Sequence, residues 1–182
     1  MPRTMETTRF GSLAVNDDEI INFPHGIPGF EEHTEWVMAG EDDNPVKWLQ
    51  SLSDGDVALP VTHPSVFLGH YAPRFADEDL EEVRQGSDEG LMLLVILSVP
   101  EGRPWETTAN LRAPIVLQHI RRVGKQIVCL NEEYSIRHGI FAREDRTAEE
   151  PEGEFPEQDA SPLDEEEGDG MSKGASRRKD AC

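Results

Sequence analysis

The stretch Leu91–Val99 reads LMLLVILSV and is the longest nearly unbroken apolar run of the chain. Gly90 and Pro100 bound it, and both residue types commonly end regular structure. A run of nine residues is too short for an ordinary helix or a membrane span, and its lack of alternation is typical of a strand covered on both faces. The sequence therefore predicts a central, doubly buried strand at this point.

Shorter strands are expected on both sides of this central strand. Apolar residues alternate with polar ones over 10–15 and again over 20–23, and the Asn-Asp-Asp turn between them predicts a hairpin. A second hairpin is expected from 113–117 and 126–130, turning around Gly124. The remaining expected strands are 35–39, 46–51, 57–62 and 135–142. Pro60 places the strand 57–62 at an edge or a bulge, and the strand 135–142 is expected to close the sheet.

One segment has a clear helical pattern. Residues 77–85 (DEDLEEVRQ) begin with acids that favour a helix N-terminus, Asp77 is a suitable cap, and Gly86 ends the segment. Strands therefore dominate, separated by turns and accompanied by one short helix. The predicted fold class is mostly β: a single closed or nearly closed, antiparallel-rich β-barrel, because closure hides strand edges.

Acidic residues are concentrated toward the C-terminus. The chain carries 37 acidic and 17 basic residues, a net charge of −20. Residues 144–182 hold 14 acidic and 5 basic residues, so a barrel domain is expected over 1–143 and a disordered acidic tail over 144–182. The charge argues against direct binding of nucleic acid, which needs clustered lysine and arginine, and favours a basic protein partner.

Residue types that commonly carry chemistry form no recognisable pattern. The six histidines are scattered without ligand spacing, and Cys129 lies in an apolar run where a buried free thiol is expected. The prediction is a protein without metal, cofactor or catalytic residues, and a small hydrolytic enzyme with its site at the barrel mouth is the alternative. Two cysteines and a polar N-terminus without a signal peptide indicate a cytoplasmic protein without a membrane span.

The stretch 21–32 reads INFPHGIPGFEE and is rich in proline and glycine. Residues 23–26 (FPHG) fit a type I turn and residues 27–30 (IPGF) a type II turn, so a rigid corner is expected, its shape set by Pro24, Gly26, Pro28 and Gly29. The stretch holds no lysine or arginine, which argues against a phosphate cradle or an RNA-binding loop. Two roles stay open: the corner closes one end of the barrel, or it offers Ile27 and Phe30 to a partner.

Four segments in a fixed order resemble the FliW family of bacterial flagellar assembly factors. They are FGSLAVNDDEIINFPHGIPGFEE (10–32), KWLQSLSDGDVALPVTHP (47–64), TTANLRAPIVL (107–117) and GKQIVCL (124–130). The resemblance covers roughly 9–143 and leaves the acidic tail outside. Two departures are local: His63 stands where the family usually has an acid, and FLGHYAP (67–73) matches the family loosely.

The resemblance implies a non-enzymatic, β-barrel-like protein with two competing protein partners. One is flagellin, and the other is CsrA, a small dimeric regulator that binds messenger RNA and represses translation. A free protein of this family antagonises CsrA, so flagellin mRNA is translated until flagellin accumulates and occupies the antagonist. The implied function is a link between flagellin level and flagellin translation, and a role as flagellin chaperone alone is the alternative. The chain on its own is expected to be a monomer.

The residues expected to contact partners come from the corner and from the other matching segments. They are Ile27, Phe30, Glu31, Trp48, Gln50, Ser51, Asn110 and Gln126. For Trp48 a place in the core is the alternative, and Asn110 lies where a side chain commonly fixes a turn. The acidic protein either covers the RNA-binding face of CsrA by mimicry or binds beside that face and repels RNA.

Overall fold

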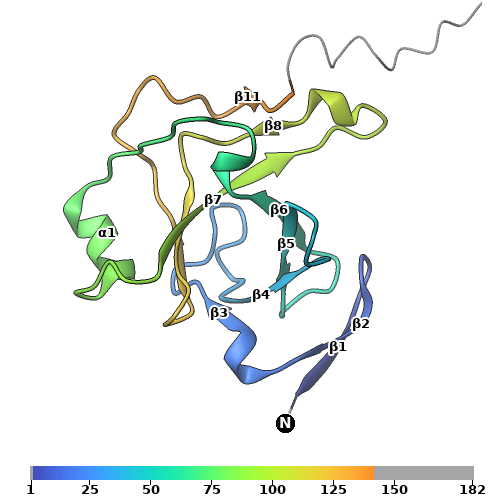
Figure 1. Ribbon diagram of the computed structural model, residues 1–182. Helices are drawn as coiled ribbons and strands as arrows, with labels where there is room; N and C mark the ends of the chain where they lie inside the picture. Colours follow the sequence, from blue (N-terminus) through green and yellow to red (C-terminus); the bar gives the residue numbers. More distant parts are fainter. Residues whose placement is uncertain (1, 142–182) are drawn as a thin grey trace, which may run out of the picture. The chain divides into compact units, whose positions relative to one another are not determined.

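The computed structural model describes residues 2–141, and strands make up most of its regular structure (Figure 1). The strands are β1 (Arg3–Thr7), β2 (Gly11–Val15), β3 (Ile20–Asn22), β4 (Glu35–Ala39), β5 (Val46–Ser51), β6 (Ala58–Thr62), β7 (Leu91–Ser98), β8 (Thr108–Ala109), β9 (Ile115–Gln118), β10 (Val123–Gln126) and β11 (His138–Gly139). The other elements of this part of the chain are the helix α1 (Asp77–Arg84) and the 3-10 turns η1 (Asp17–Glu19), η2 (Pro64–Val66) and η3 (Pro104–Glu106). The prediction of a mostly β fold with one short helix is confirmed, whereas the predicted tail at 144–182 lies outside the described residues.

A closed barrel forms the centre of the fold. The hydrogen-bonded order is β7-β6-β5-β4-β3-β10-β9, and β9 pairs with β7 to complete the ring (Figure 1). Every pairing in the ring is antiparallel except that of β3 with β10, which is parallel at Asn22 and Val123. The expectation that Pro60 places its strand at an edge is wrong, because β6 lies between β5 and β7; Pro60 pairs with Trp48 of β5 and lies outside the two residues that pair with β7. The predicted closed, antiparallel-rich barrel is confirmed.

Strand β7 closes the ring. Its first half, Leu91–Leu94, pairs with β9, and its second half pairs with β6 and then with β8. Because successive side chains of a strand point to opposite faces, one set enters the barrel and the other packs outside it. The inward set is Met92, Leu94 and Ile96, whereas Leu91, Leu93, Val95 and Leu97 join two outer clusters. The prediction of a strand covered on both faces is confirmed.

One apolar cluster fills the barrel interior. Trp36 and Leu49 are fully buried in it, and Phe23 packs edge-on to Trp36 with ring centroids 6.2 Å apart. Strand β10 contributes its backbone, because a methyl group added at Gly124 would lie 2.5 Å from Cζ of Phe23. Glycine at this position therefore lets Phe23 approach the barrel wall.

Helix α1 covers the outside of the barrel beside β9 and β10. Val83 is buried with Val116 and Ile127, and the ammonium group of Lys125 lies 2.7 Å from a carboxylate oxygen of Asp79. The prediction that Asp77 caps the helix is wrong. Ala76 holds the capping position without a side-chain hydrogen bond, and Asp77 is the first helical residue, where its charge still favours the helix N-terminus.

The first hairpin also differs from the prediction. Strand β2 pairs with β1 rather than with β3, in a register that places Met5 opposite Leu13. The backbone N–H of Asn16 donates to the carboxylate of Glu19 at 2.7 Å, which stabilises the turn η1. Since this turn leads β3 away from β2 to pair with β4 and β10, the expected hairpin of 10–15 with 20–23 is wrong.

The second hairpin is confirmed in its pairing but not in its bounds. Strands β9 and β10 are antiparallel, and the chain turns at 119–122, so Gly124 lies inside a strand rather than at the turn. Residues 127–130 lie outside strand β10, although the N–H groups of Ile127 and Cys129 still donate to the carbonyls of Pro114 and Arg112. Strand β11 pairs with β8 beside the barrel, so the expectation that 135–142 closes the sheet is wrong; the pairing of β7 with β9 closes it.

Replacing Gly124 with alanine tests the contact between β10 and the barrel interior. The added methyl group would lie 2.5 Å from Phe23, so the ring or the strand must shift, and overpacking of this kind costs about 1–3 kcal/mol. Gly69→Ala is the matched control, because a methyl group there meets nothing within 4 Å. Urea unfolding is expected to show a lower free energy of unfolding for Gly124→Ala alone, and equal midpoints for the two variants would contradict the described packing.

Candidate functional site

Two tight turns form the connection between β3 and β4, and residues 23–31 are called the corner below. The N–H of Gly26 donates to the carbonyl of Phe23 at 2.8 Å and closes the first turn. The N–H of Phe30 donates to the carbonyl of Ile27 at 2.6 Å and closes the second. Gly29 has a φ of 88° at the third position of the second turn, as a type II turn requires. Both predicted turns are therefore present.

The corner folds back on itself at Gly26. This residue has a φ of 66°, and a methyl group on it would lie 2.5 Å from the Cα atom and the carbonyl oxygen of Glu31. Glycine meets both requirements, because it has no Cβ atom and tolerates a positive φ. The other residues assigned to the shape of the corner, Pro24, Pro28 and Gly29, are exposed.

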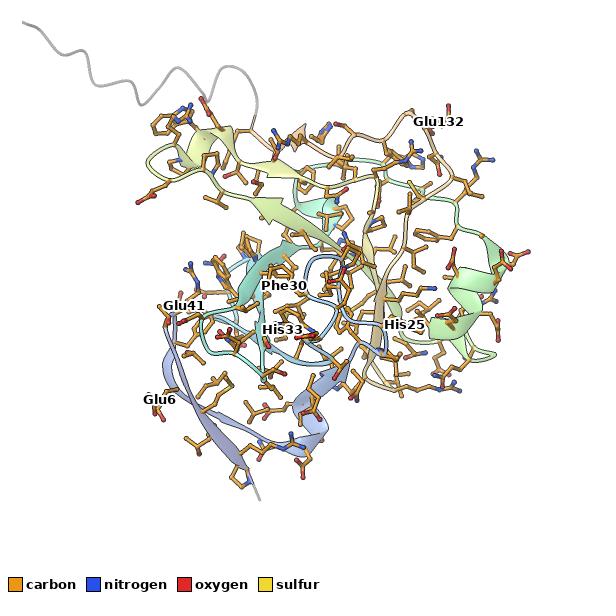
Figure 2. All side chains as sticks on the ribbon, turned by 180° about the vertical axis from the view of Figure 1, so that it is seen from behind. Glu6, His25, Phe30, His33, Glu41 and Glu132 are labelled. Atoms are coloured by element: carbon orange, nitrogen blue, oxygen red, sulfur yellow. The ribbon has the colours of Figure 1, made fainter. Side chains whose placement is uncertain are left out.

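The two apolar residues of the second turn have different environments. Ile27 is 1% exposed and belongs to the interior cluster, so the expectation that this side chain is offered at a surface is wrong. Phe30 is half-buried and lies beside His33 (Figure 2). It packs edge-on to His33 and Trp36, with ring centroids 5.7 Å and 6.2 Å apart. Of the two roles that the sequence left open, closure of the barrel is filled by Ile27, while Phe30 remains partly accessible.

Glu31 is exposed at the edge of the corner. Its carboxylate accepts a hydrogen bond of 2.9 Å from the N–H of Gly29. This bond, together with the residue's own N–H, holds the pKa of Glu31 below its usual value, because a hydrogen bond to the ionised form favours that form. Glu32 beside it is also exposed. The corner therefore combines a partly accessible aromatic ring with an acidic rim.

Gln50 and Ser51 are fully buried, so the expectation that they lie at a partner surface is wrong. The amide nitrogen of Gln50 donates to the carbonyl of Val57 at 3.0 Å, and the hydroxyl of Ser51 accepts from the N–H of Ser53 at 3.1 Å. These bonds shape the turn between β5 and β6. The hydroxyl of Ser51 also lies 2.7 Å from Nδ1 of His33, which connects this turn to the corner.

Trp48 is half-buried and lies outside the interior cluster. The guanidinium group of Arg9, from the turn between β1 and β2, lies 3.5 Å from the centre of its ring in a cation–π contact. The ring borders a shallow cavity of 690 Å³ together with Pro60 and Val99. Trp48 is thus a surface aromatic rather than a core residue.

The side chains of Asn110 and Gln126 both bind the backbone of Ala113. The side-chain oxygen of Asn110 accepts from the N–H of Ala113 at 3.0 Å, and the side-chain amide of Gln126 donates to the carbonyl of Ala113 at 2.8 Å. Both residues therefore fix the chain before β9, which agrees with the turn-fixing role considered for Asn110.

Asn110 also borders a large open cavity that the sequence reasoning missed. The cavity measures 910 Å³ and is called the Ile136 groove below; its lining is Asn110, Arg112, Ala113, Val128, Tyr134, Ser135, Ile136 and Arg137. Cys129 is buried, as predicted, and its neighbours Val128 and Leu130 consequently point outward. In the sequence, apolar residues on both sides of Cys129 are the signal that could have indicated this exposed surface. The same run of apolar residues predicts a strand, which hides the signal.

Comparison of the sequence with models of known protein families shows to which family the chain belongs. The model of the family described as FliW protein matches residues 4–140, which is nearly the whole described part of the chain. The chain belongs to the FliW family. The resemblance found in four short segments therefore extends over the complete barrel, the β1–β2 hairpin and the corner.

Individual FliW relatives agree with this assignment. The flagellar assembly factor FliW of Thermotoga maritima is 39% identical over 132 residues, which are 72% of this chain and 89% of the relative. The flagellar assembly factor FliW of Thermosipho africanus is 41% identical over 134 residues, 73% of this chain and 92% of the relative. A crystal structure of the flagellar assembly factor FliW superposes with a TM-score of 0.71 at 31% identity and covers 77% of this chain and 98% of its own.

Membership of the FliW family agrees with the prediction that the chain is not an enzyme. Of the residues expected to contact partners, the structure brings the corner and Ser51 together through His33, and it brings Asn110 and Gln126 together at Ala113. Over residues 2–141 no helix is long and apolar enough to cross a membrane.

Acidification tests the hydrogen bond to Glu31. Because the folded protein lowers the pKa of this carboxyl, the bond stabilises the fold above the pKa of the unfolded chain and is lost as the pH falls through the folded pKa. Glu31→Gln is therefore expected to unfold more easily than the parent at pH 7 and equally easily at strongly acidic pH. The control is Glu32→Gln, a neighbouring exposed carboxyl, and a difference that persists at low pH would contradict the assignment.

Proposed function

We propose that this chain is a flagellar assembly factor that binds flagellin and the translational regulator CsrA by direct protein contact. The family match over residues 4–140 carries the proposal, together with relatives that bear the name flagellar assembly factor FliW. By antagonising CsrA the chain relieves repression of flagellin mRNA, and by binding flagellin it ends that antagonism. Flagellin level and flagellin translation are linked in this way.

The charge of the chain supports the choice of a basic, RNA-binding partner. With a net charge of −20 the protein attracts basic surfaces and repels the phosphate backbone of RNA. A bound acidic protein disfavours RNA whether it covers the RNA-binding face or lies beside it. Since attraction between exposed charges is screened by salt, the association rate with CsrA is expected to fall as ionic strength rises.

The corner is the surface with the composition expected of a contact site. Phe30 supplies a partly buried aromatic anchor, and the exposed residues Glu31 and Glu32 follow it directly in the chain. Protein interfaces commonly combine an aromatic centre with a polar rim. The corner is also preorganised by its own backbone bonds, so little conformational entropy is lost when a partner binds it.

Substitutions in the corner test this contact. Phe30→Ala and Glu31→Lys are each expected to weaken binding of CsrA about 5- to 30-fold, the range in which anchor and charged interface residues commonly fall. Glu6→Lys is the matched control, because it makes the same change of charge at an exposed residue of β1 away from Phe30 (Figure 2). Calorimetric titration of the full chain with purified CsrA measures the three affinities.

The same titration with flagellin separates the possible results. Binding of both partners, with each reducing the binding of the other, is the expected outcome. Binding of flagellin without CsrA would restrict the function to that of a chaperone. Absence of binding to either partner at micromolar concentration in low salt would overturn the proposal, and equal affinities of Glu31→Lys and Glu6→Lys for CsrA would remove the corner from the interface.

A further inference from the structure

The Ile136 groove is an apolar surface that the proposed function leaves without a role. Val128 and Ile136 line it with 63% and 64% of their surface exposed. Leu130, on the other side of the buried Cys129 from Val128, is 56% exposed. Single exposed apolar residues are ordinary, but three gathered between 128 and 136 form the kind of surface that binds another protein.

Hydrogen bonds hold the walls of the Ile136 groove in place. The N–H of Cys129 donates to the carbonyl of Arg112 at 2.9 Å, and the N–H of Leu111 donates to the carbonyl of Ser135 at 3.0 Å. The guanidinium group of Arg112 donates to the carbonyl of Asn131 at 3.0 Å, which fixes this cation beside the cavity. The groove is therefore formed before any partner arrives, so binding costs little conformational entropy.

The charge of the Ile136 groove is opposite to that of the chain as a whole. The described residues that line it include Arg112 and Arg137 and no carboxylate, in a protein of net charge −20. A nearby acid, Glu133, accepts a hydrogen bond of 2.8 Å from the side chain of Asn131 and also interacts with the charge of Arg112. Arg137 is exposed and forms no ion pair with an acid of residues 2–141, so its charge is available to a ligand.

Guanidinium groups beside exposed aliphatic side chains favour a ligand that carries both carboxylates and an apolar ring. Arginine binds a carboxylate through two parallel N–H donors, and the aliphatic side chains offer area that a ring covers. The groove, at 910 Å³, is large enough to accept an aromatic side chain with its flanking backbone. A nucleic acid is also negative, but its long phosphate backbone is repelled by an acidic protein, whereas a short peptide segment is confined to the groove.

We propose that the Ile136 groove binds an acidic segment of a partner protein that carries an aromatic side chain. The ring of the partner packs against Val128 and Ile136, and its carboxylates pair with Arg112 and Arg137. This partner is opposite in charge to the basic regulator proposed for the corner, so the two surfaces select different proteins. The inference is independent of the proposed function, because it concerns residues outside the corner.

Methyl NMR of the full chain with a synthetic probe tests the proposal. The probe is the acetylated and amidated peptide EEFEE, and the matched peptides are KKFKK, of opposite charge, and EEAEE, without the ring. EEFEE is expected to shift the methyl resonances of Val128 and Ile136, while those of Val66 in η2 and Val99 after β7, which are also exposed, stay in place. KKFKK is expected to leave Val128 and Ile136 unchanged. EEAEE is expected to bind about 5-fold more weakly than EEFEE or worse, because it buries less apolar area.

A charge reversal in the groove gives a second readout. Arg137→Glu is expected to weaken binding of EEFEE about 5-fold, because an attraction becomes a repulsion. Arg122→Glu is the matched control, since it makes the same change at an exposed arginine outside the lining, and its affinity for EEFEE is expected to equal that of the parent. Both side chains are exposed, so neither change removes a residue of the core.

Four results would overturn the proposal. The first is no response of Val128 and Ile136 to EEFEE, or an equal response to KKFKK. The second is equal affinity of Arg137→Glu and Arg122→Glu for EEFEE. The third is an equal shift of Val128 and Ile136 with a single-stranded oligonucleotide, which would assign the groove to polyanions in general. The fourth is a dependence of these resonances on the concentration of the free protein, which would assign the groove to a second copy of the chain.

Discussion

The pairing of β7 with β9 is the constraint on which the rest of the structure depends. It joins the two ends of the sheet, so the interior cluster around Trp36 and Leu49 is enclosed on all sides. Because closure leaves both faces of β7 covered, the strand is apolar along nearly its whole length. The side strands β8 and β11 extend from the same strand, and helix α1 packs over its partner β9.

Closure of the barrel also determines what the corner presents. Phe23 packs against Gly124 and Trp36 inside the ring, and Ile27 follows it into the interior, so the second turn is anchored from within. Phe30 is then held half-buried against His33, whose ring lies beside the hydroxyl of Ser51. The accessible features of the corner, an aromatic edge and the Glu31 carboxylate, thus depend on residues buried inside the barrel.

Local patterns in the sequence predict those features whose physical cause is local. The run at Leu91–Val99 specified a doubly covered strand, and the proline and glycine positions of the corner specified two turns. The partners of each strand depend on contacts distant in sequence, so the pairing of β2 with β1 and the role of Gly124 were missed. Burial was misjudged for Gln50 and Ser51 for the same reason, since polar side chains become interior when they bind a neighbouring turn.

We propose that the rigid, acidic corner on the closed FliW barrel binds partner proteins. The most direct measurement is backbone amide NMR of the labelled full chain during titration with CsrA and, separately, with flagellin. The amides of Phe30, Glu31 and Glu32 are expected to shift with at least one partner, while those of the enclosed strand β7 remain unchanged. Shifts confined to other surfaces with both partners, leaving these three amides in place, would contradict it.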